Sequence, residues 1–166
     1  VWSYRKGTSE ASAPIDEWRQ PGFTEDPSWL LGTTVIGYGD GDDTTILNDM
    51  QNSYSSVFLR KQFDVSGTLP SQLLVRVYYD DGAIVWINGV EVARLEIALG
   101  DITFEGIRAS DRPGGTPGAA IGSHERAWVD VTVPGAAGIL VPGTNTIAVH
   151  AFNTSEGSSD FSIDCE

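Results

Sequence analysis

The chain has 166 residues, which suits one domain with a full hydrophobic core. Its hydrophobic content of 40%, with five Trp, six Phe and five Tyr, excludes a disordered chain. The net charge of −13 argues against nucleic acid and anionic membranes as partners, because both attract basic surfaces. No apolar run approaches the roughly 18 residues of a membrane-spanning helix.

The first 34 residues lack a hydrophobic period, and their prolines exclude a long helix. Aromatic side chains bury large areas and dominate protein cores. We therefore predict an irregular segment with one or two short strands. Its aromatic side chains are expected to pack onto the rest of the domain: Trp2, Tyr4, Trp18, Phe23 and Trp29.

A loop rich in Gly and Asp follows at residues 37–44, after a short apolar run. Calcium takes roughly six to eight oxygen ligands, several of them carboxylates, and a flexible acidic loop can supply them. The loop is not an EF-hand, because it lacks the glutamate at the twelfth position and the flanking helices. Asp40, Asp42 and Asp43 are therefore candidate metal ligands, and a solvated turn without metal is the alternative.

Alternating apolar residues predict four strands in the centre of the chain, at 54–65, 71–79, 83–88 and 90–95. Asn88-Gly89 favours a type I′ hairpin, since both central positions of that turn need φ > 0. Asp80-Asp81-Gly82 predicts a second tight turn, so that the last three strands become consecutive antiparallel neighbours. The two adjacent carboxylates serve either turn chemistry, as in an Asx-turn, or a metal or ligand. The side chains of adjacent strand residues point to opposite faces of a sheet. Asp80 and Asp81 can therefore reach one ion only if the turn or a cis peptide bond redirects one of the two side chains.

The stretch 96–127 is irregular and rich in Gly and Pro, and long loops of this kind are usually functional or mobile. Three further strands are predicted, at 127–133, 146–152 and 161–164. In total, the sequence predicts about eight or nine strands at spacings of roughly 8–20 residues, and it predicts no long amphipathic helix. We therefore expect a single all-β sandwich domain over residues 1–166.

Enzyme motifs are absent from the sequence. It contains no G-x-S-x-G, no H-E-x-x-H and no P-loop, and the single cysteine, Cys165, allows neither a disulfide within the domain nor a cysteine-based zinc site. His150 is expected to be a hydrogen-bonded strand histidine and His124 an exposed loop residue. A carboxylate pair for glycoside cleavage depends only on spatial separation, so the sequence leaves it open. We predict that the domain is not an enzyme.

Several blocks of sequence resemble the galactose-binding-like jelly roll, an accessory domain of secreted bacterial glycoside hydrolases and polysaccharide lyases. The blocks are D-D-G followed by I-N-G-V-E-V-A-R, then P-G-T-N-T-I-A-V-H, and finally S-S-D-F-S-I-D, at 79–94, 142–150 and 158–164. Residues 37–41 and 54–63 are similar to the N-terminal blocks of such domains. The resemblance implies a jelly-roll fold of antiparallel strands, a frequent structural calcium, and sugar binding at the loop end or on a sheet face.

The Asp80-Asp81-Gly82 turn is also similar to that of PA14-type lectins, in which adjacent aspartates hold a calcium that coordinates sugar hydroxyls. Asp80 and Asp81 therefore join the candidate metal ligands. Sugar binding further needs an aromatic face and a few polar groups. The candidate aromatic residues are Tyr38, Tyr54 and Trp86, and the candidate polar residues are Asp80, Asp81, Asn88, Arg94, Asn153 and Asp160.

The resulting hypothesis is a non-catalytic carbohydrate-binding module, stabilised by Ca²⁺, that targets a polysaccharide for an attached catalytic domain. It is expected to be monomeric and extracellular, and to be part of a larger multidomain secreted protein. The alternative is a structural or adhesion module of a large surface protein, without glycan binding.

Overall fold

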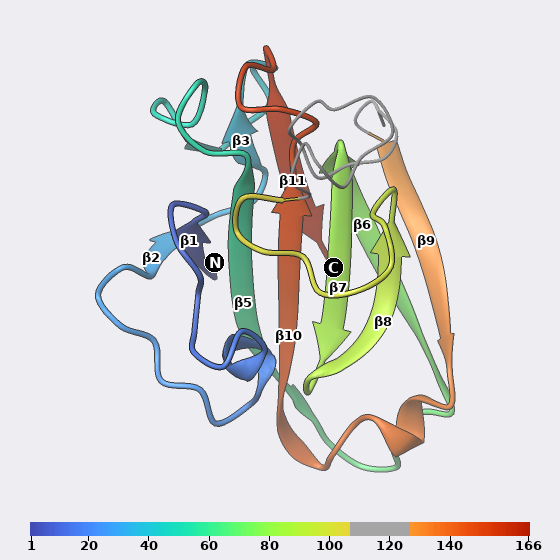
Figure 1. Ribbon diagram of the computed structural model, residues 1–166. Coiled ribbons are helices and arrows are strands. Elements are labelled where there is room, and N and C mark those ends of the chain that lie inside the picture. Colours follow the sequence, from blue (N-terminus) through green and yellow to red (C-terminus); the bar gives the residue numbers. More distant parts are fainter. Residues whose placement is uncertain (107–126) are drawn as a thin grey trace.

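Two β-sheets pack face to face in the computed structural model, which describes residues 1–106 and 127–166 (Figure 1). The six-stranded sheet contains, in spatial order, β2 (Leu30–Gly32), β1 (Trp2–Lys6), β5 (Ser56–Val65), β10 (Gly143–Phe152), β7 (Gly82–Ile87) and β8 (Val90–Leu95). The five-stranded sheet contains β4 (Thr45–Ile46), β3 (Ile36–Tyr38), β11 (Phe161–Cys165), β6 (Gln72–Asp80) and β9 (Ala127–Pro134). The all-β sandwich is thus confirmed. The described residues form 11 strands rather than eight or nine, because strands as short as β2 and β4 leave no alternating pattern.

The strand order is that of a jelly roll. The antiparallel set β3-β11-β6-β9 faces the antiparallel set β5-β10-β7-β8, and the chain changes sheet at each step from β5 to β7 and from β9 to β11. Strands β1 and β2 extend one sheet, while β4 runs parallel to β3 at the edge of the other. Two 3₁₀ turns complete the described elements, η1 (Glu17–Arg19) and η3 (Ala136–Gly138). No helix among the described residues is long and apolar enough to cross a membrane.

The two predicted turns of the central segment have different outcomes. Asn88 and Gly89, with φ values of 50° and 81°, connect the paired strands β7 and β8, so the hairpin is confirmed. The hairpin at Asp80-Asp81-Gly82 is wrong. There the chain leaves the five-stranded sheet at the end of β6 and enters the six-stranded sheet at the start of β7, and the peptide bond between the two aspartates is cis. Asp and Gly are suited both to a hairpin and to a corner at which the chain passes from one sheet to the other. Which of the two forms depends on the strands with which the next segment pairs, and these are distant in the sequence.

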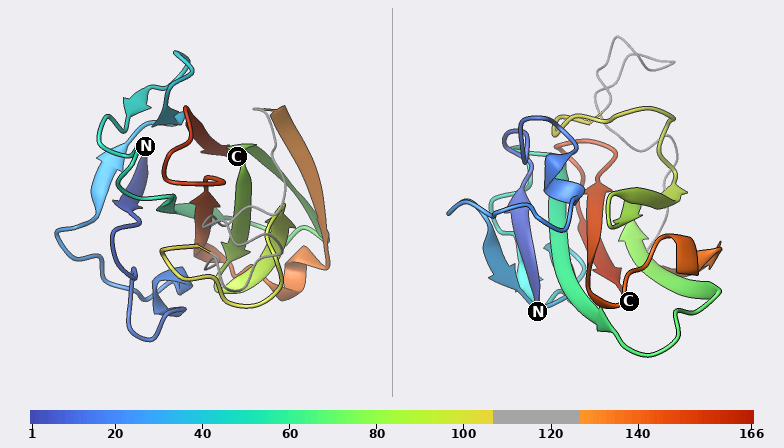
Figure 2. Two further views of the ribbon diagram at one scale, coloured as in Figure 1. Left: turned by 45° about the horizontal axis from the view of Figure 1, so that its top comes forward. Right: turned by 90° about the horizontal axis from the view of Figure 1, so that it is seen from below.

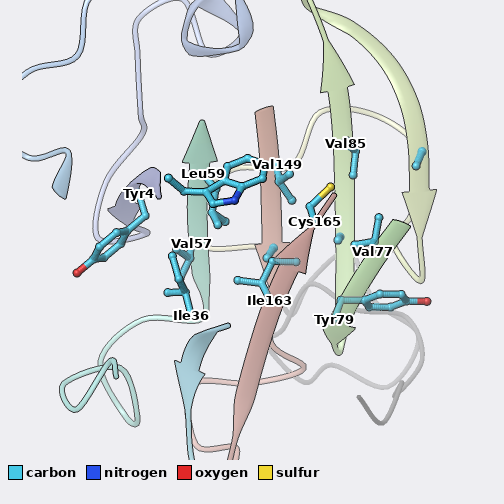
Figure 3. Packing of buried hydrophobic residues seen from close by; sticks show 14 of the residues in the cluster. Tyr4, Ile36, Val57, Leu59, Val77, Tyr79, Val85, Val149, Ile163 and Cys165 are labelled. Carbon is cyan, nitrogen blue, oxygen red and sulfur yellow. The ribbon is translucent and has the colours of Figure 1, made fainter. Parts of the chain in front are cut away.

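The main core lies between the sheets, and Figure 3 shows its side chains pointing toward one another. Valines and isoleucines from both sheets are fully buried, among them Val57, Val85 and Ile163, each of which contributes about 1.5–3 kcal/mol. The free thiol of Cys165 is also buried here, and burial raises its pKa to about 12. Cys165 therefore packs as a small hydrophobic group.

A second hydrophobic cluster covers the outer face of the six-stranded sheet. Trp18 of η1 packs against Phe58 and Trp86, and Trp29 packs against Trp18, so that β7 is buried on both faces. Figure 2 shows the N-terminal segment, in blue, crossing this sheet, and η1 contacts β10. The predicted packing of the N-terminal aromatic residues onto the sandwich is confirmed, together with two short strands in that segment.

His150 on β10 lies inside this second cluster. Its ring is 1% exposed and lies 3.9 Å, between ring centroids, from Phe58 and also from Phe152. Its Nε2 has no hydrogen-bond partner within the described part of the chain. Burial, and then the charge of Arg19, lowers the pKa of His150 well below 6.5. The other histidine, His124, and most of the irregular stretch 96–127 lie outside the described residues.

The buried neutral imidazole of His150 predicts a loss of stability in acid. The unfolded chain takes up a proton near pH 6.5 while the folded chain does not, so stability is present above that pH and is lost as the pH falls below it. Relative to His150→Leu, the free energy of unfolding of the wild type should fall by up to about 1.4 kcal/mol per pH unit below 6.5. Urea unfolding from pH 7.5 to 5 measures this difference, with His124→Gln as the control. Parallel pH profiles would contradict the prediction.

Candidate metal and ligand sites

Three carboxylates meet at one end of the sandwich. Asp40 follows β3, Asp80 ends β6 and Asp160 precedes β11, and one oxygen of each lies within 4.8 Å of the others. They meet because β11 lies between β3 and β6 in the sheet, which brings the loops beside these strands to the same end (Figure 1). Asp80 is buried, with 3% exposed, and the other two are half-buried. We call these three residues the acidic cluster.

Glycines allow the loop that carries Asp40 to approach β11. A Cβ on Gly37 would lie 1.9 Å from the carbonyl oxygen of Phe161. Gly39 has a φ of 101°, and a Cβ there would lie 2.5 Å from the carbonyl oxygen of Ser159. Any larger residue at these positions would push the loop away from the strand. The Gly-Asp alternation of this loop therefore places one aspartate against β6 and β11.

Polar groups surround the acidic cluster. Ser162 donates from its hydroxyl to Asp40 at 3.1 Å, and the Nδ2 of Asn153 donates to the carbonyl oxygen of Asp160 at 2.7 Å. The hydroxyl of Tyr38 donates to the carbonyl oxygen of Ser158 at 2.8 Å. Burial, followed by the charge of Asp160, raises the pKa of Tyr38 to about 12, so the phenol stays protonated at neutral pH.

The cluster has the chemistry of a calcium site. Hard carboxylate oxygens suit Ca²⁺, whereas zinc prefers His and Cys ligands. Two carboxylates at this separation repel each other by on the order of 3–4 kcal/mol near a protein surface, so a shared cation would be favourable. Serine, tyrosine and backbone oxygens nearby are further donors of the type that calcium accepts. The residues present therefore fit the ion.

The five predicted metal ligands are divided by the structure. Asp40 and Asp80 belong to the acidic cluster, and Asp160, predicted only as a sugar contact, joins them. The other three lie outside this set of three carboxylates. The carboxylate of Asp42 accepts from the hydroxyl of Tyr78 at 2.8 Å, that of Asp43 from Ser162 at 3.3 Å, and that of Asp81 from the amide of Thr154 at 2.8 Å.

Several predicted sugar contacts turn out to be structural. Trp86 is 3% exposed, with the guanidinium of Arg19 4.1 Å above its ring, and Tyr54 is 3% exposed and donates to Asp49. Burial also raises the pKa of Tyr54. Neither ring offers a face to a ligand in this structure. Strand alternation could not reveal this, because the N-terminal segment covers the face of β7 that holds Trp86.

Two more predicted sugar contacts make hydrogen bonds away from the cluster. Asn88, at the opposite end of β7, donates from Nδ2 to the carbonyl oxygen of Ile139 at 2.9 Å and to Asn145 at 2.8 Å. Arg94 donates to both carboxylate oxygens of Glu91, at 2.8 and 2.6 Å. Tyr38 and Asn153 thus adjoin the cluster and Asp160 belongs to it, whereas Asn88 and Arg94 are hydrogen-bonded to other residues.

A hollow in the described part of the chain is lined by residues other than those of the cluster. Its volume is about 470 Å³, and Phe23, Glu25 and Arg60 are among the residues that line it. Arg60 and Glu25 form an ion pair at 3.0 Å inside it, and burial lowers the pKa of Arg60. The buried guanidinium therefore already has a counter-charge of its own.

An exposed tryptophan was missed by the sequence reasoning. Trp128 on β9 is 40% exposed, although tryptophan is usually buried. The alternation of residues 127–133 assigned it to one side of a strand without saying which side faces solvent. Which side of β9 faces solvent depends on its pairing with β6 and on the other sheet, which covers the inner face of both strands. Both are features of the tertiary structure.

Comparisons with known proteins give fold relatives only. No protein-family model and no curated protein matches the sequence. Among solved structures, the chain is similar to Ruminococcus gnavus β-glucuronidase, alone and in complex with uronic isofagomine, at 13% identity, with a TM-score of 0.51 and 92% of this chain covered. Bifidobacterium dentium β-glucuronidase complexed with coumarin-3-O-glucuronide matches over 91% of this chain at 19% identity, with a TM-score of 0.48.

The likeness concerns a small part of those enzymes. The chain spans 20% of the length of the Ruminococcus gnavus chains and 19% of the Bifidobacterium dentium chain. At such low identity, the match to the former shows a shared β-sandwich fold. The present fold thus occurs as one part of a larger glycoside hydrolase chain.

Proposed function

We propose that the chain is a non-catalytic carbohydrate-binding domain of the galactose-binding-like jelly-roll type, which holds a calcium ion and directs an attached enzyme to a polysaccharide. The observation that carries the proposal is the convergence of Asp40, Asp80 and Asp160 at the loop end of the sandwich. The occurrence of this fold within β-glucuronidase chains supports a role beside a carbohydrate-active catalytic domain. An extracellular location and a monomeric state belong to the same proposal.

Calcium would be held by the three carboxylates of the acidic cluster. The ion would supply coordination that ties the loops of Asp40 and Asp160 to the end of β6. Tyr38 and Asn153, which adjoin the cluster, would then present a hydroxyl and an amide at a fixed place. A sugar at this end would meet polar groups suited to its hydroxyls.

Calcium is expected to raise the melting temperature of the domain. An ion at about 100 times its dissociation constant stabilises the folded state by about 2.7 kcal/mol, a shift of roughly 5–10 °C for a domain of this size. Differential scanning fluorimetry with calcium and with chelator measures the shift. Asp160→Asn should abolish most of it, whereas Glu156→Gln, an exposed carboxylate in the same loop, should keep it. An equal shift in both variants, or none in the wild type, would contradict a calcium site at the cluster.

Glycan binding is tested by affinity electrophoresis of the wild type through gels that contain neutral or anionic polysaccharides, with and without calcium. Retardation by at least one polysaccharide is expected. If no polysaccharide retards the domain under either condition, the proposed function is wrong, and a structural or adhesion role becomes the better account.

A further inference from the structure

The outer face of the five-stranded sheet carries an ordered row of side chains on β6 and β9. The two strands are antiparallel neighbours, and their outward residues form the cross-strand pairs Leu74 with Thr132, Arg76 with Asp130, and Tyr78 with Trp128. The residues between them on β6, Val75 and Val77, point inward and are buried. We call Leu74, Arg76, Tyr78, Trp128 and Asp130 the outer platform.

Aromatic and aliphatic surface is exposed on this platform. Trp128 is 40% exposed and Leu74 is 55% exposed, and both stand on strands rather than on loops. The ring of Tyr78 lies 5.6 Å from that of Trp128, between centroids, at an interplanar angle of 46°, and the Cζ of Arg76 lies 5.0 Å from the Trp128 ring centroid. The indole is thus held against two neighbours while much of its surface meets solvent.

Charged neighbours hold the platform in place. Arg76 donates from Nε to Asp130 at 3.0 Å and from a terminal nitrogen to Glu166 at 2.7 Å, while Tyr78 donates to Asp42 at 2.8 Å. Side chains that are fixed in this way lose little further freedom when a ligand binds. The platform is therefore organised before a ligand arrives.

We propose that the outer platform binds a neutral polysaccharide chain that runs along β6 and β9, with a sugar ring stacked on Trp128. The inference rests on the proposed carbohydrate-binding function and places a contact surface outside the acidic cluster. An indole face suits the apolar face of a pyranose, and the adjoining guanidinium and carboxylates suit its hydroxyls.

Charge and shape select this occupant. Among the described residues, the three carboxylates of Asp42, Asp130 and Glu166 adjoin the platform beside the guanidinium of Arg76, so an anionic glycan would be repelled. The Arg76–Asp130 ion pair separates Leu74 from Trp128, so polar groups that can meet sugar hydroxyls stand between the two exposed apolar side chains. The row from Leu74 to Tyr78 is about 13 Å long, which is the scale of an oligosaccharide.

The test compares Trp128→Ala, Trp128→Phe and Asp160→Asn with the wild type by affinity electrophoresis and titration of tryptophan fluorescence. The probes are hydroxyethylcellulose, xylan, galactomannan and mixed-linkage glucan, with polygalacturonate as the anionic comparison. For the neutral probe that binds the wild type, Trp128→Ala should lower affinity at least tenfold, and Trp128→Phe should recover part of the loss. Leu99→Ala, which removes an apolar side chain that is 92% exposed outside the platform, should bind like the wild type.

Each other outcome has a distinct reading. If Trp128→Ala bound the polysaccharide with wild-type affinity, the proposal that the outer platform is the binding surface would be wrong. The proposed carbohydrate-binding function would still stand, and Asp160→Asn would then be expected to lose binding. Tighter binding of polygalacturonate than of every neutral probe would overturn the proposed ligand class. A wild type that binds none of the probes would overturn both proposals. Melting curves of each variant confirm that a loss of binding is not a loss of folding.

Discussion

Replacing Trp18 with Ala is expected to lower the free energy of unfolding by about 3–5 kcal/mol, the range for a large aromatic side chain removed from a core. Trp18 is 1% exposed, although its 3₁₀ turn has only three residues. Its ring packs edge-on against Phe58 at 5.0 Å and against Trp86 at 5.6 Å, between centroids. The variant therefore opens a cavity and loosens the segment that covers the outer face of the six-stranded sheet.

Urea unfolding followed by circular dichroism measures the effect of Trp18→Ala, and limited proteolysis should show faster cleavage within the N-terminal segment. Trp128→Ala is the matched control, because it removes the same side chain from a site that is 40% exposed. That control should cost less than about 1 kcal/mol. If the two variants were equally stable, the N-terminal segment would not be an integral part of the fold.

Replacing Asn145 with Ala is expected to cost about 3 kcal/mol or more. The side chain is fully buried at 0% exposed, and its amide is hydrogen-bonded on every side. Its Oδ1 accepts from Asn88 at 2.8 Å and from the amide of Val141 at 2.9 Å, and its Nδ2 donates to the carbonyl oxygens of Val141 and Gly143 at 2.8 Å. Alanine removes these four bonds at once and takes the acceptor from the part-buried donors of Asn88 and Val141, and each such hydrogen bond contributes about 0.5–1.5 kcal/mol.

The matched control for Asn145→Ala is Thr144→Ala at the neighbouring exposed position, whose hydroxyl donates to Asp64 at 2.7 Å. It should cost less than about 1 kcal/mol, because water replaces an exposed hydrogen bond. Urea unfolding at pH 7 gives both values, and the slope of the free energy with urea concentration should stay unchanged if the native fold is kept. Equal losses in the two variants would show that the network around Asn145 adds nothing specific.

The strands were predictable wherever alternation was long. Strands β5, β6, β9 and β10 run over eight to ten residues, which is enough for an inside–outside period to stand out. Asn88-Gly89 was predictable as a hairpin because the required backbone angles leave few residue choices. Shorter strands such as β4, with two residues, carry no such signal. The failure at Asp80-Asp81-Gly82 has the same cause, since turn residues describe a local bend and not the sheet in which the next strand pairs.

The candidate site was predictable only in part. An Asp-rich loop and a pair of adjacent aspartates were visible as oxygen-rich segments, and one member of each, Asp40 and Asp80, joins the acidic cluster. Asp81 was expected beside Asp80, but its carboxylate accepts from the amide of Thr154 instead. Asp160 completes the cluster from more than 75 residues further along the chain, and only the position of β11 between β3 and β6 brings it there.

Composition and the alternation of apolar side chains were enough to predict an all-β sandwich with buried N-terminal aromatic residues, because both are local properties of the chain. Which aspartates meet, that Trp86 is covered and that Trp128 is exposed follow only from how distant segments pack together. The reason is physical. Each strand has two faces, and a side chain is core or surface according to what the rest of the chain places against that face. In a jelly roll the decisive neighbours come from the other end of the sequence.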